Sequence, residues 1–525
     1  MIQLNRFINS YFGGIYYPLI LIVILIPTIF LPLGIDQSTF VRGGEVLFGG
    51  TKLYAQYIEQ KPPLIFLLYG SAGSLFGNSD IGYRFFDFLW QLFAVVSLLY
   101  CLKRLTQSQT IGFIAAVTYS VLYLSMGHSE SMECESFIAP LIIWYLYFSC
   151  STNSNTKKNL LIRGVLLGFC FGFKFTFGIL LPAVIFWEIL YDKAELLKRI
   201  VLIFTGFLFA FLCSLWVLFD SEVFYGYLRV LEYTRVYASN PPINLEFARR
   251  ALMEIGRFFG DNISLSVTVL ASIGVFFTVK NNSSDNKNQV GRLASMSIII
   301  LIALLVSIVI ERKFNPYHFL RLFIPLSVLV SLGFPQLILI VKKSWNETIL
   351  LWKVLLIFVG CIGFLMSPIP RCIKNIRSSV LYFTSQDSYW ATYQKDGDPA
   401  LIMVDSRNIT SLIRSSQKKG KTFVISTSAG YIYRLLDEHP ISKFSMPVYY
   451  YATITPKGAY EEMIEEVKQS NWLVIQKNDV HPLLYGHNLS CWQRVQNDSV
   501  MVNYLNTNFK QKAEIGAFYV FERNE

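Results

Sequence analysis

The chain has 525 residues, of which 53% are hydrophobic, 16% aromatic and only 15% charged. A soluble protein of this size needs far more charged residues to cover its surface. Several uncharged apolar runs reach about 18 residues, roughly the length that spans a hydrocarbon core. The composition therefore excludes a soluble globular protein and predicts a polytopic α-helical membrane protein.

About eleven apolar segments are candidate transmembrane helices, namely residues 16–35, 81–102, 109–127, 135–150, 160–175, 177–191, 200–219, 262–279, 294–310, 318–341 and 348–368. The stretch 160–191 can form either one long helix or two short ones. Basic residues flank both of its ends, and "GFKFTFG" (172–178) offers a turn with two glycines and a lysine. Two short spans fit better, because both basic ends then face the cytoplasm.

Lys and Arg exceed Asp and Glu by 46 to 35, and much of this excess lies in short loops between the apolar runs, at 101–105, 156–159, 193–199, 279–292 and 341–343. Short basic loops face the cytoplasm, so the positive charge reflects membrane topology and no nucleic-acid partner is expected. The N-terminus is then cytoplasmic and everything after residue 370 lies outside. The predicted outer segments are 34–80, 128–134, 220–260, 311–317 and the C-terminal tail.

The first outer segment is too long for a bare loop. "DQSTFVRGGEVLFGG" (36–50) and "PPLIFLLYGSAGSLFG" (62–77) are amphipathic or apolar, yet too short to span a membrane. They predict two helices that lie in the membrane interface at 36–76. Pro62 and Pro63 suit the first turn of the second helix.

From residue 371 the composition changes to that of a soluble α/β domain. Helical periodicity and strand-like runs alternate there, with helices predicted at 407–420 and 459–470 and strands at 421–426, 471–476 and 517–523. Such alternation favours a small layered domain. We therefore expect a transmembrane module at 1–370 and an extracytoplasmic α/β domain at 371–525, in which Cys372 and Cys491 could form a disulfide.

Carboxylates occur at two places on the predicted outer face. Asp36 follows the first apolar run, where a carboxylate can simply be solvated among lipid headgroups. A second acidic group lies in "GHSESMECESF" (127–137), which contains His128, Glu130, Glu133 and Glu135. At least one of these acids belongs to a solvated turn. Glu135 lies at the start of the next helix, where the helix dipole favours an anion.

Cations gather where a late span enters the membrane, in "ERKFNPYHFLRLFIP" (311–325), which contains Arg312, Lys313, His318 and Arg321. Arg321 lies about one turn after His318, so both can share a helix face. Snorkelling towards the headgroups is the default interpretation. The sharper one is an anion site for a lipid phosphate, to which Lys61 and Lys174 could add. Cations that hold a phosphate leaving group, with a carboxylate that accepts a proton from a hydroxyl, suit chemistry on a membrane-embedded phosphate ester.

Several short motifs occur in an order that is typical of a known family. An acidic residue follows the first span, "KPP" (61–63) precedes the next, and "FGNSDIGYRF" (76–85) contains Arg84. "KFNPYHFLRLFIPLSVLV" (313–330) is similar to a late motif of the same family. Over about residues 15–340 the chain resembles the GT-C superfamily of integral membrane glycosyltransferases, in the branch of protein O-mannosyltransferases and lipid A aminoarabinose transferase.

The resemblance implies a GT-C-like fold, a polyprenyl-phosphate-linked sugar donor, and an inverting transfer to a lipid, glycan or protein on the outer face of a bacterial inner membrane. It implies that Asp36 is the catalytic base and that Glu135, or Glu133 by a small shift, is the second-loop acid. Together with the residue patterns, it predicts donor-phosphate or substrate contacts from Lys61, Arg84, His128, Lys174, Arg312, His318 and Arg321. Gln37 stands where many relatives carry a second acid, so no metal and no obligatory cofactor is predicted.

Two other functions remain open. An O-antigen ligase or polymerase usually carries one very large outer loop and arginine-rich motifs, which this sequence lacks. A transporter or flippase of lipid-linked saccharides needs charges that line a path through the middle of the membrane, whereas the polar residues here crowd one face.

Overall fold

The computed structural model describes residues 16–191, 195–239, 241–261, 264–281, 289–347, 350–395, 398, 401–436, 442–451, 455, 457–480 and 488–524. The predicted cytoplasmic N-terminal residues 1–15 and much of the predicted basic loop 279–292 lie outside these ranges. The chain divides into two compact units. Unit 1 comprises Met1–Leu31, Arg84–Leu215 and Ile243–Arg377, and unit 2 comprises Pro32–Tyr83, Trp216–Pro242 and Ser378–Glu525.

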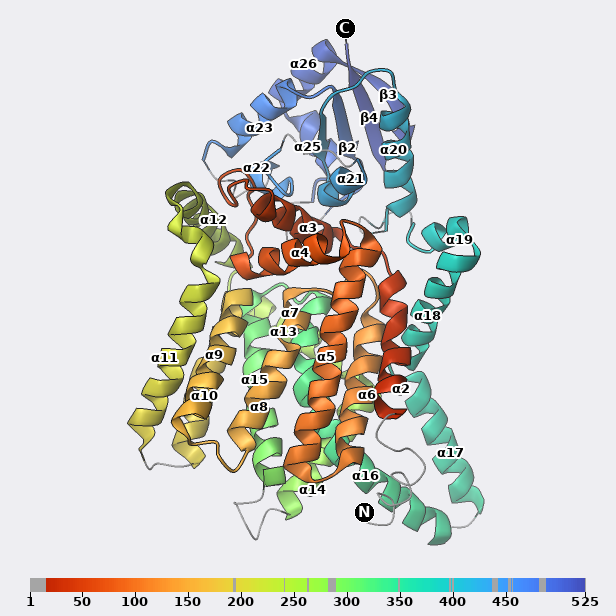
Figure 1. Ribbon diagram of the computed structural model, residues 1–525. Coiled ribbons are helices and arrows are strands. Elements are labelled where there is room, and N and C mark those ends of the chain that lie inside the picture. The colour runs from red at the N-terminus through yellow and green to blue at the C-terminus, as the bar shows by residue number, and fades with distance from the viewer. Residues whose placement is uncertain are drawn as a thin grey trace. The chain divides into compact units, whose positions relative to one another are not determined.

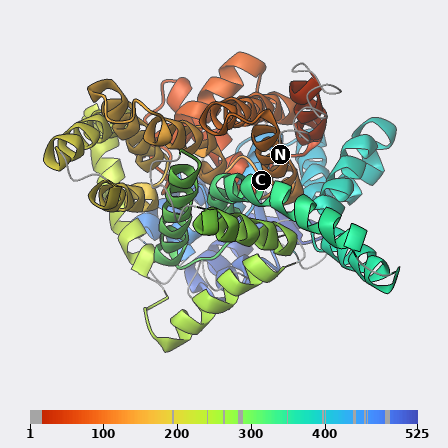
Figure 2. The same cartoon turned by 90° about the horizontal axis from the view of Figure 1, so that it is seen from below.

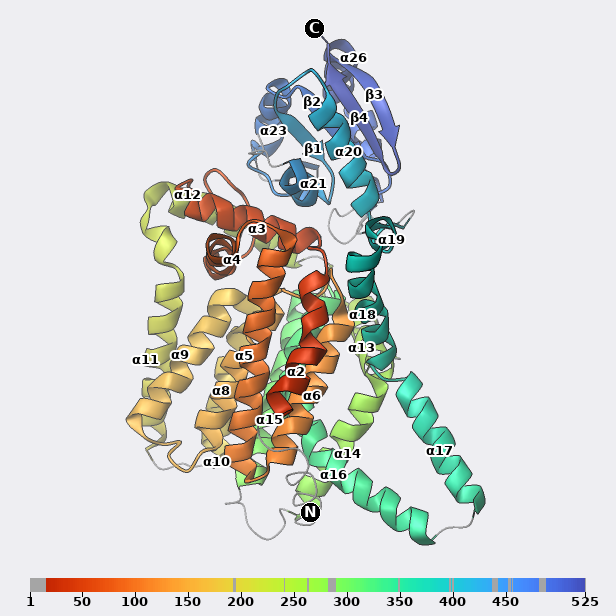
Figure 3. The same cartoon turned by 45° about the vertical axis from the view of Figure 1, so that its right-hand side comes forward.

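Unit 1 is a bundle of helices, which Figure 2 views roughly end-on. Its elements are α2 (Tyr16–Leu25), η1 (Ile26–Phe30), most of α5 (Asp80–Thr106), α6 (Gln109–Met126), α7 (Cys134–Phe137), α8 (Ala139–Cys150), α9 (Lys157–Phe173), η2 (Phe175–Ile179), α10 (Leu180–Tyr191), α11 (Leu196–Ser214), α13 (Leu245–Gly260), α14 (Leu265–Asn281), α15 (Gln289–Glu311), η5 (Pro316–Leu322), α16 (Phe323–Glu347), α17 (Leu350–Leu365) and the start of α18 (Ile369–Thr384). The first helix, α2, packs beside α6 (Figure 3).

The apolar segments predicted from the sequence coincide with helices, but several of these helices are short or interrupted. Within the described ranges, five helices are long and apolar enough to cross a membrane, or up to eight if each bent pair of helices is one span. The segment 135–150, for example, breaks into α7 and α8. The count of about eleven spans therefore stays a prediction.

The predicted turn within 160–191 is confirmed. Helix α9 ends at Phe173, Lys174 has extended backbone (φ −162°), and η2 and α10 follow. Helix α9 runs closely along α11 (Figure 1) because glycines face the crossing: a Cβ atom at Gly164 or Gly206 would collide with the backbone of the other helix. Small residues allow such close packing between apolar helices, and the packing fixes the helix that ends at Phe173, just before Lys174.

Unit 2 contains a four-stranded sheet and the helices around it. The sheet order is β1-β2-β4-β3, with β1 parallel to β2 and the other pairs antiparallel. The elements are α3 (Ile35–Phe48), α4 (Pro63–Phe76), η3 (Trp216–Phe219), α12 (Ser221–Ser239), the end of α18, α19 (Gln386–Ala391), α20 (Met403–Ser415), β1 (Thr422–Ile425), α21 (Ala429–Leu436), α22 (Val448–Tyr451), α23 (Ala459–Lys468), β2 (Trp472–Gln476), α25 (Cys491–Asn497), α26 (Ser499–Asn508), β3 (Phe509–Ile515) and β4 (Phe518–Arg523).

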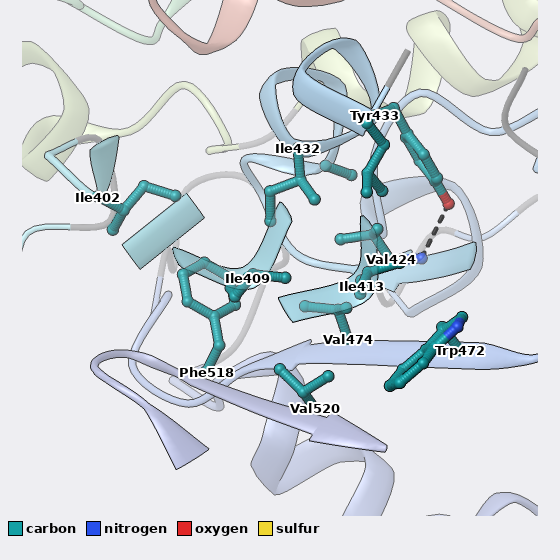
Figure 4. Packing of buried hydrophobic residues seen from close by; sticks show 12 residues of the cluster. Ile402, Ile409, Ile413, Val424, Ile432, Tyr433, Trp472, Val474, Phe518 and Val520 are labelled. Atoms are coloured by element: carbon teal, nitrogen blue, oxygen red, sulfur yellow. Dashed lines mark hydrogen bonds between the residues drawn. The ribbon is translucent and has the colours of Figure 1, made fainter. Parts of the chain in front are cut away.

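The sheet packs against α20 and α21 through a compact apolar core. Ile409, Ile413 and Ile432 from the helices meet Val474 and Val520 from the strands (Figure 4). The helices and strands predicted in this region are confirmed, with bounds shifted by a few residues. The elements that were not predicted include β3, α19, α21, α22, α25 and α26. All eight cysteines are free thiols, so the disulfide considered between Cys372 and Cys491 is not formed.

The two short helices predicted at 36–76 are confirmed as α3 and α4. Gln37 caps α3, since its Oε1 accepts a hydrogen bond of 2.7 Å from the Gly34 backbone N–H. Helix α3 packs on α4 and also on α21, where a Cβ atom at Gly430 would lie 3.1 Å from Thr39 Oγ1. The first outer segment thus folds together with the C-terminal sheet in unit 2.

Candidate functional site

Five titratable residues meet in unit 1 and form what we name the buried ion cluster. Glu135 lies in the first turn of α7, and Lys174 lies between α9 and η2. Glu311 is the last residue of α15, while His318 and Arg321 belong to η5. Residues that are up to 186 positions apart in the sequence are thereby brought into direct contact.

Each carboxylate of the buried ion cluster bridges both cations. Lys174 Nζ lies 2.7 Å from Glu135 Oε1 and 2.7 Å from Glu311 Oε2. Arg321 Nη2 lies 2.6 Å from Glu135 Oε1 and 2.7 Å from Glu311 Oε1. His318 Nε2 is 3.0 Å from Glu311 Oε2. Such short contacts are typical of charge-assisted hydrogen bonds.

The buried ion cluster is electrically balanced and almost closed to solvent. The side chain of Lys174 is 13% exposed, and the other four are less exposed than that. Two carboxylates neutralise the two permanent cations when His318 is uncharged. Buried charges are tolerated only when they are paired and hydrogen-bonded, so the positive charge of Lys174 and Arg321 is already neutralised within the protein.

Neighbouring side chains hold the buried ion cluster in one geometry. Thr176 Oγ1 donates a hydrogen bond of 2.5 Å to Glu311 Oε1, and Arg321 Nη1 donates one of 2.7 Å to Ser307 Oγ. The Arg321 guanidinium also lies 4.8 Å from the centroid of the Phe177 ring. Secondary contacts of this kind fix side-chain orientation, which a catalytic site requires.

The local backbone explains why His318 and Arg321 act together. In a 3₁₀ helix there are three residues per turn, so residues 318 and 321 point to the same side of η5. Pro316 occupies a first-turn position of this helix, where its missing N–H is tolerated. Glu130 Oε2 accepts a hydrogen bond of 2.9 Å from the Tyr317 N–H and so fastens η5 to the loop 127–133.

Arg84 holds the loop 127–133, which contains His128, in place through hydrogen bonds. Arg84 is fully buried and donates hydrogen bonds to the His128 carbonyl (2.6 Å), Ser131 Oγ (2.7 Å) and the Leu31 carbonyl (3.2 Å). Burial lowers the pKa of His128 to about 3, and the positive charge of Arg84 adds to this shift. Glu133, at the N-cap of α7, is fully buried as well.

Three further cations form what we name the cationic group: Arg312 and Lys313, which follow α15, and Arg250 of α13, whose charge acts on Lys313. Burial lowers the pKa of Lys313 to about 8, helped by the charges of Arg312 and Arg250. The ring of Phe314 packs against Phe247 of α13, at 6.0 Å between centroids. Arg312 and Phe314 have φ of 60° and 52°, a strained region for non-glycine residues that often marks a functional site.

In unit 2, Asp36 lies in the first turn of α3 and is half-buried. Among the residues that the structure describes, it has no hydrogen-bond or ion-pair partner. Nearby Glu59 is buried and accepts a hydrogen bond of 2.7 Å from Ser445 Oγ. Burial raises the pKa of Glu59, the charge of Lys61 opposes this shift, and Asp36 adds to it. The Lys61 Nζ lies 5.7 Å from the Phe40 ring centroid.

The structure thus brings four predicted residues together in unit 1, namely Glu135, Lys174, His318 and Arg321. Glu311 completes this group but was not predicted, although it is the only acid in the quoted segment 311–325. In unit 2, Asp36 and Lys61 lie within electrostatic range of Glu59. Glu59 was also missed, although an acid two positions before the Lys-Pro-Pro motif is a readable signal.

A metal ion does not fit the buried ion cluster. Glu135, Glu311 and His318 offer ligand atoms within 4.8 Å of one another, as a metal site does. However, the oxygen atoms Glu135 Oε1, Glu311 Oε1 and Glu311 Oε2 already contact Lys174 or Arg321. A divalent cation would have to displace these contacts or add charge to a balanced buried group, which is unfavourable. We therefore derive no reaction step through a metal.

Comparison with known proteins supports the resemblance that the motifs indicate. A family model described as dolichyl-phosphate-mannose-protein mannosyltransferase matches residues 60–219. An uncharacterized protein of Aquifex aeolicus (strain VF5) is 27% identical over 191 residues, which are 34% of this chain and 36% of that protein. The match thus spans about a third of the relative's length.

Solved structures share the fold over nearly the whole chain. ArnT from Cupriavidus metallidurans bound to undecaprenyl phosphate has a TM-score of 0.59 at 12% identity, with 98% of each chain covered. The same protein in the apo state has a TM-score of 0.57 at 13% identity, with 97% of each chain covered. The oligosaccharyltransferase AglB from Archaeoglobus fulgidus, in complex with an inhibitory peptide and a dolichol-phosphate, has a TM-score of 0.51 at 12% identity, covering 97% of this chain and 74% of that one. The chain is therefore a multi-pass membrane protein with the fold of the GT-C glycosyltransferases.

Proposed function

We propose that the protein transfers a sugar from a polyprenyl-phosphate donor to an acceptor hydroxyl, with inversion at the anomeric carbon. The acceptor is a lipid, glycan or protein at the outer face of a bacterial inner membrane. The match to a mannosyltransferase family model supports this proposal. So does the fold shared with a protein solved with undecaprenyl phosphate and with one solved with a dolichol-phosphate.

One observation carries the assignment of the base: the carboxylate of Asp36 has no hydrogen-bond or ion-pair partner among the residues that the structure describes, whereas Glu135 and Glu311 are paired. Glu135 and Glu311 each contact two cations, which stabilise their ionised forms and make them poor proton acceptors. Asp36 is half-buried and has neither a hydrogen-bond nor an ion-pair partner among the described residues. A general base needs a carboxylate that is accessible to the incoming hydroxyl, and Asp36 meets this requirement.

The proposed reaction is a single displacement. The acceptor oxygen attacks the anomeric carbon of the donor sugar while its proton passes to the Asp36 carboxylate. The bond between the anomeric carbon and the phosphate oxygen breaks, and its electron pair leaves with the polyprenyl phosphate. Positive charge near that oxygen stabilises the transition state. We assign this role to Lys61, which lies in unit 2 together with Asp36.

The buried ion cluster has a different role in this proposal. Its cations are neutralised by Glu135 and Glu311, so they offer little charge to a phosphate. Its contacts join the ends of α9 and α15 to α7 and η5. We assign its members as positioning residues, which hold the segment 312–315 in its strained conformation.

The test uses the purified full chain in lipid nanodiscs with a panel of labelled polyprenyl-phosphate sugars. Transfer to an added acceptor extract is expected for the wild type, and Asp36→Asn should lower kcat about 10²- to 10⁴-fold. Asp387→Asn is the matched control, because Asp387 also lies in the first turn of a helix and is exposed. Full turnover by Asp36→Asn would refute the base assignment. Transport of a lipid-linked saccharide across vesicles, without transfer, would favour the flippase alternative.

A further inference from the structure

A polar pocket of about 380 Å³ lies in unit 2, between α3, α4 and α21. Its volume falls in the range of small-molecule sites, about 300–1,000 Å³. The polar side chains that line it come from three separate segments and include Arg42, Glu45, Ser74, Asn78, Tyr433 and Arg434. We name it the α3–α21 pocket.

The α3–α21 pocket and Asp36 lie on opposite faces of one helix. An α-helix turns about 100° per residue and rises about 1.5 Å per residue. Glu45 follows Asp36 by nine positions, so it lies about two and a half turns and about 13 Å further along α3. Arg42, which also lines the pocket, is displaced by about 240° from Asp36. The pocket is therefore separate from the proposed proton acceptor.

The charges at the α3–α21 pocket cancel. Arg42 Nη1 lies 3.2 Å from Glu45 Oε2, and Arg434 pairs with Asp80. There is no positive surplus to recognise a phosphate, and the anion sites of proteins typically need one. A ligand that only accepts hydrogen bonds would offer nothing to the Glu45 carboxylate, and a ligand that only donates would offer nothing to the guanidinium groups.

The polar groups at the α3–α21 pocket favour a ligand that both donates and accepts hydrogen bonds. Arg434 Nε is buried and has no hydrogen-bond partner within the described ranges. Buried donors without a partner are rare in native proteins and need an explanation. The rings of Phe48, Tyr83 and Tyr433 also line the pocket, so planar charged groups and aromatic surfaces occur together. Sugar hydroxyls donate and accept at once, and the apolar face of a sugar ring packs on aromatic side chains.

We propose that the α3–α21 pocket binds a neutral saccharide, at a site distinct from the transfer site. Only the role of that saccharide, as acceptor glycan or glycosylated product, rests on the proposed function. Its place in unit 2, on the helix that carries Asp36, suits a site that holds a glycan chain while one end of it reacts.

The test measures binding of an array of neutral di- and trisaccharides, with glucose 1-phosphate as the anionic probe, to the full chain in nanodiscs. Glu45→Gln removes the acceptor charge, and Ser74→Trp fills the pocket from an exposed position on α4. Each should weaken neutral saccharide binding at least about tenfold. Glu254→Gln is the control, since Glu254 also pairs with an arginine three positions away and is similarly exposed, at 24% against 26% for Glu45. Glu254→Gln and Asp36→Asn should bind as the wild type does.

Three outcomes would overturn the proposal that the α3–α21 pocket binds a neutral saccharide. Neutral saccharides do not bind, glucose 1-phosphate binds in preference to them, or Asp36→Asn abolishes saccharide binding while Ser74→Trp retains it. Thiol reactivity of the buried cysteines on heating shows that each variant is folded. If saccharides bind in the expected pattern but the protein has no transferase activity, the proposed function is contradicted and the saccharide site is supported. If the protein transfers sugar but the pocket binds no saccharide, the saccharide site is contradicted and the proposed function is supported.

Discussion

Glu311 closes the buried ion cluster, and its replacement by glutamine allows a quantitative test of that geometry. Its oxygens lie 2.7 Å from Lys174 Nζ and 2.7 Å from Arg321 Nη2. At an effective dielectric constant of about 20, each contact is worth about 6 kcal/mol before desolvation is counted. Desolvation offsets much of this gain in the intact cluster. Removing one partner leaves a buried positive charge uncompensated, which costs about 3–5 kcal/mol. We expect Glu311→Gln to lower the free energy of unfolding by this amount.

A double-mutant cycle separates charge balance from other effects of the substitution. Lys174→Met removes the surplus cation that Glu311→Gln creates. The double variant should therefore be more stable than the sum of the single changes predicts, by about 1–3 kcal/mol. Unfolding in a titration with sodium dodecyl sulfate is followed by the reactivity of the buried thiols of Cys134 and Cys170, which lie beside Glu135 and four positions before Lys174.

An exposed ion pair of the same chemistry supplies the control for this experiment. Glu195 lies 2.9 Å from Lys198, but its side chain is 67% exposed. Glu195→Gln should therefore change the free energy of unfolding by less than about 1 kcal/mol. The reasoning is refuted if Glu311→Gln is no more damaging than Glu195→Gln, or if the effects of Glu311→Gln and Lys174→Met simply add.

Three further predictions concern pH, metal and the donor phosphate. Burial raises the pKa of Glu466 from its ordinary value of about 4.5 to about 7, so the folded state holds this proton more tightly than the unfolded chain. The free energy of unfolding should fall as pH rises from about 4.5 to 7, by about 3 kcal/mol at most. A Glu466→Gln variant whose free energy of unfolding depends on pH as that of the wild type does would contradict this. Transfer activity should persist in excess EDTA, because the cluster carboxylates already hold Lys174 and Arg321, and a loss restored by added divalent ions would show that this is wrong. Lys61→Met should weaken affinity for a polyprenyl phosphate at least about tenfold, whereas Lys52→Met, which removes an exposed lysine from ion pairs with two surface acids, should bind as tightly as the wild type.

The sequence was sufficient to predict elements whose structure is determined by residues within one short segment. The break at Lys174 could be predicted because two glycines and a charge interrupt an apolar run whose two ends carry basic residues. The helices at 36–76 could be predicted because their apolar runs are too short to span the membrane. The strands β1, β2 and β4 were readable as apolar runs bounded by polar turns. In each case the residues that determine the element are neighbours in the sequence.

Long-range pairing explains what the sequence did not reveal about the site. Membrane topology could place Glu135, Lys174, His318 and Arg321 at one end of the bundle, but not their pairing. Glu311 was missed because it ends an apolar run and is followed by two cations, so it resembles an ordinary charge at the headgroup level. Its role depends on contacts with segments 137 and 10 positions away.

Burial was equally unreadable from the sequence. Arg84 belongs to a family motif, and nothing in that motif shows that its guanidinium bonds to the loop 127–133. Likewise, the grouping of α3 with the C-terminal sheet depends on contacts such as those of Gly430 with Thr39 and of Ile58 with Lys443. These contacts join segments almost 400 residues apart, and no pattern within either segment indicates them.

The central claim is that Asp36 accepts the proton in sugar transfer from a lipid phosphate. The most direct test measures the single-turnover rate and the donor affinity of Asp36→Asn separately. The account predicts that the rate falls about 10²- to 10⁴-fold while the dissociation constant for the polyprenyl-phosphate donor stays within about threefold of the wild-type value. A variant that retains the wild-type rate, or one whose loss of rate is explained entirely by loss of donor binding, would contradict it.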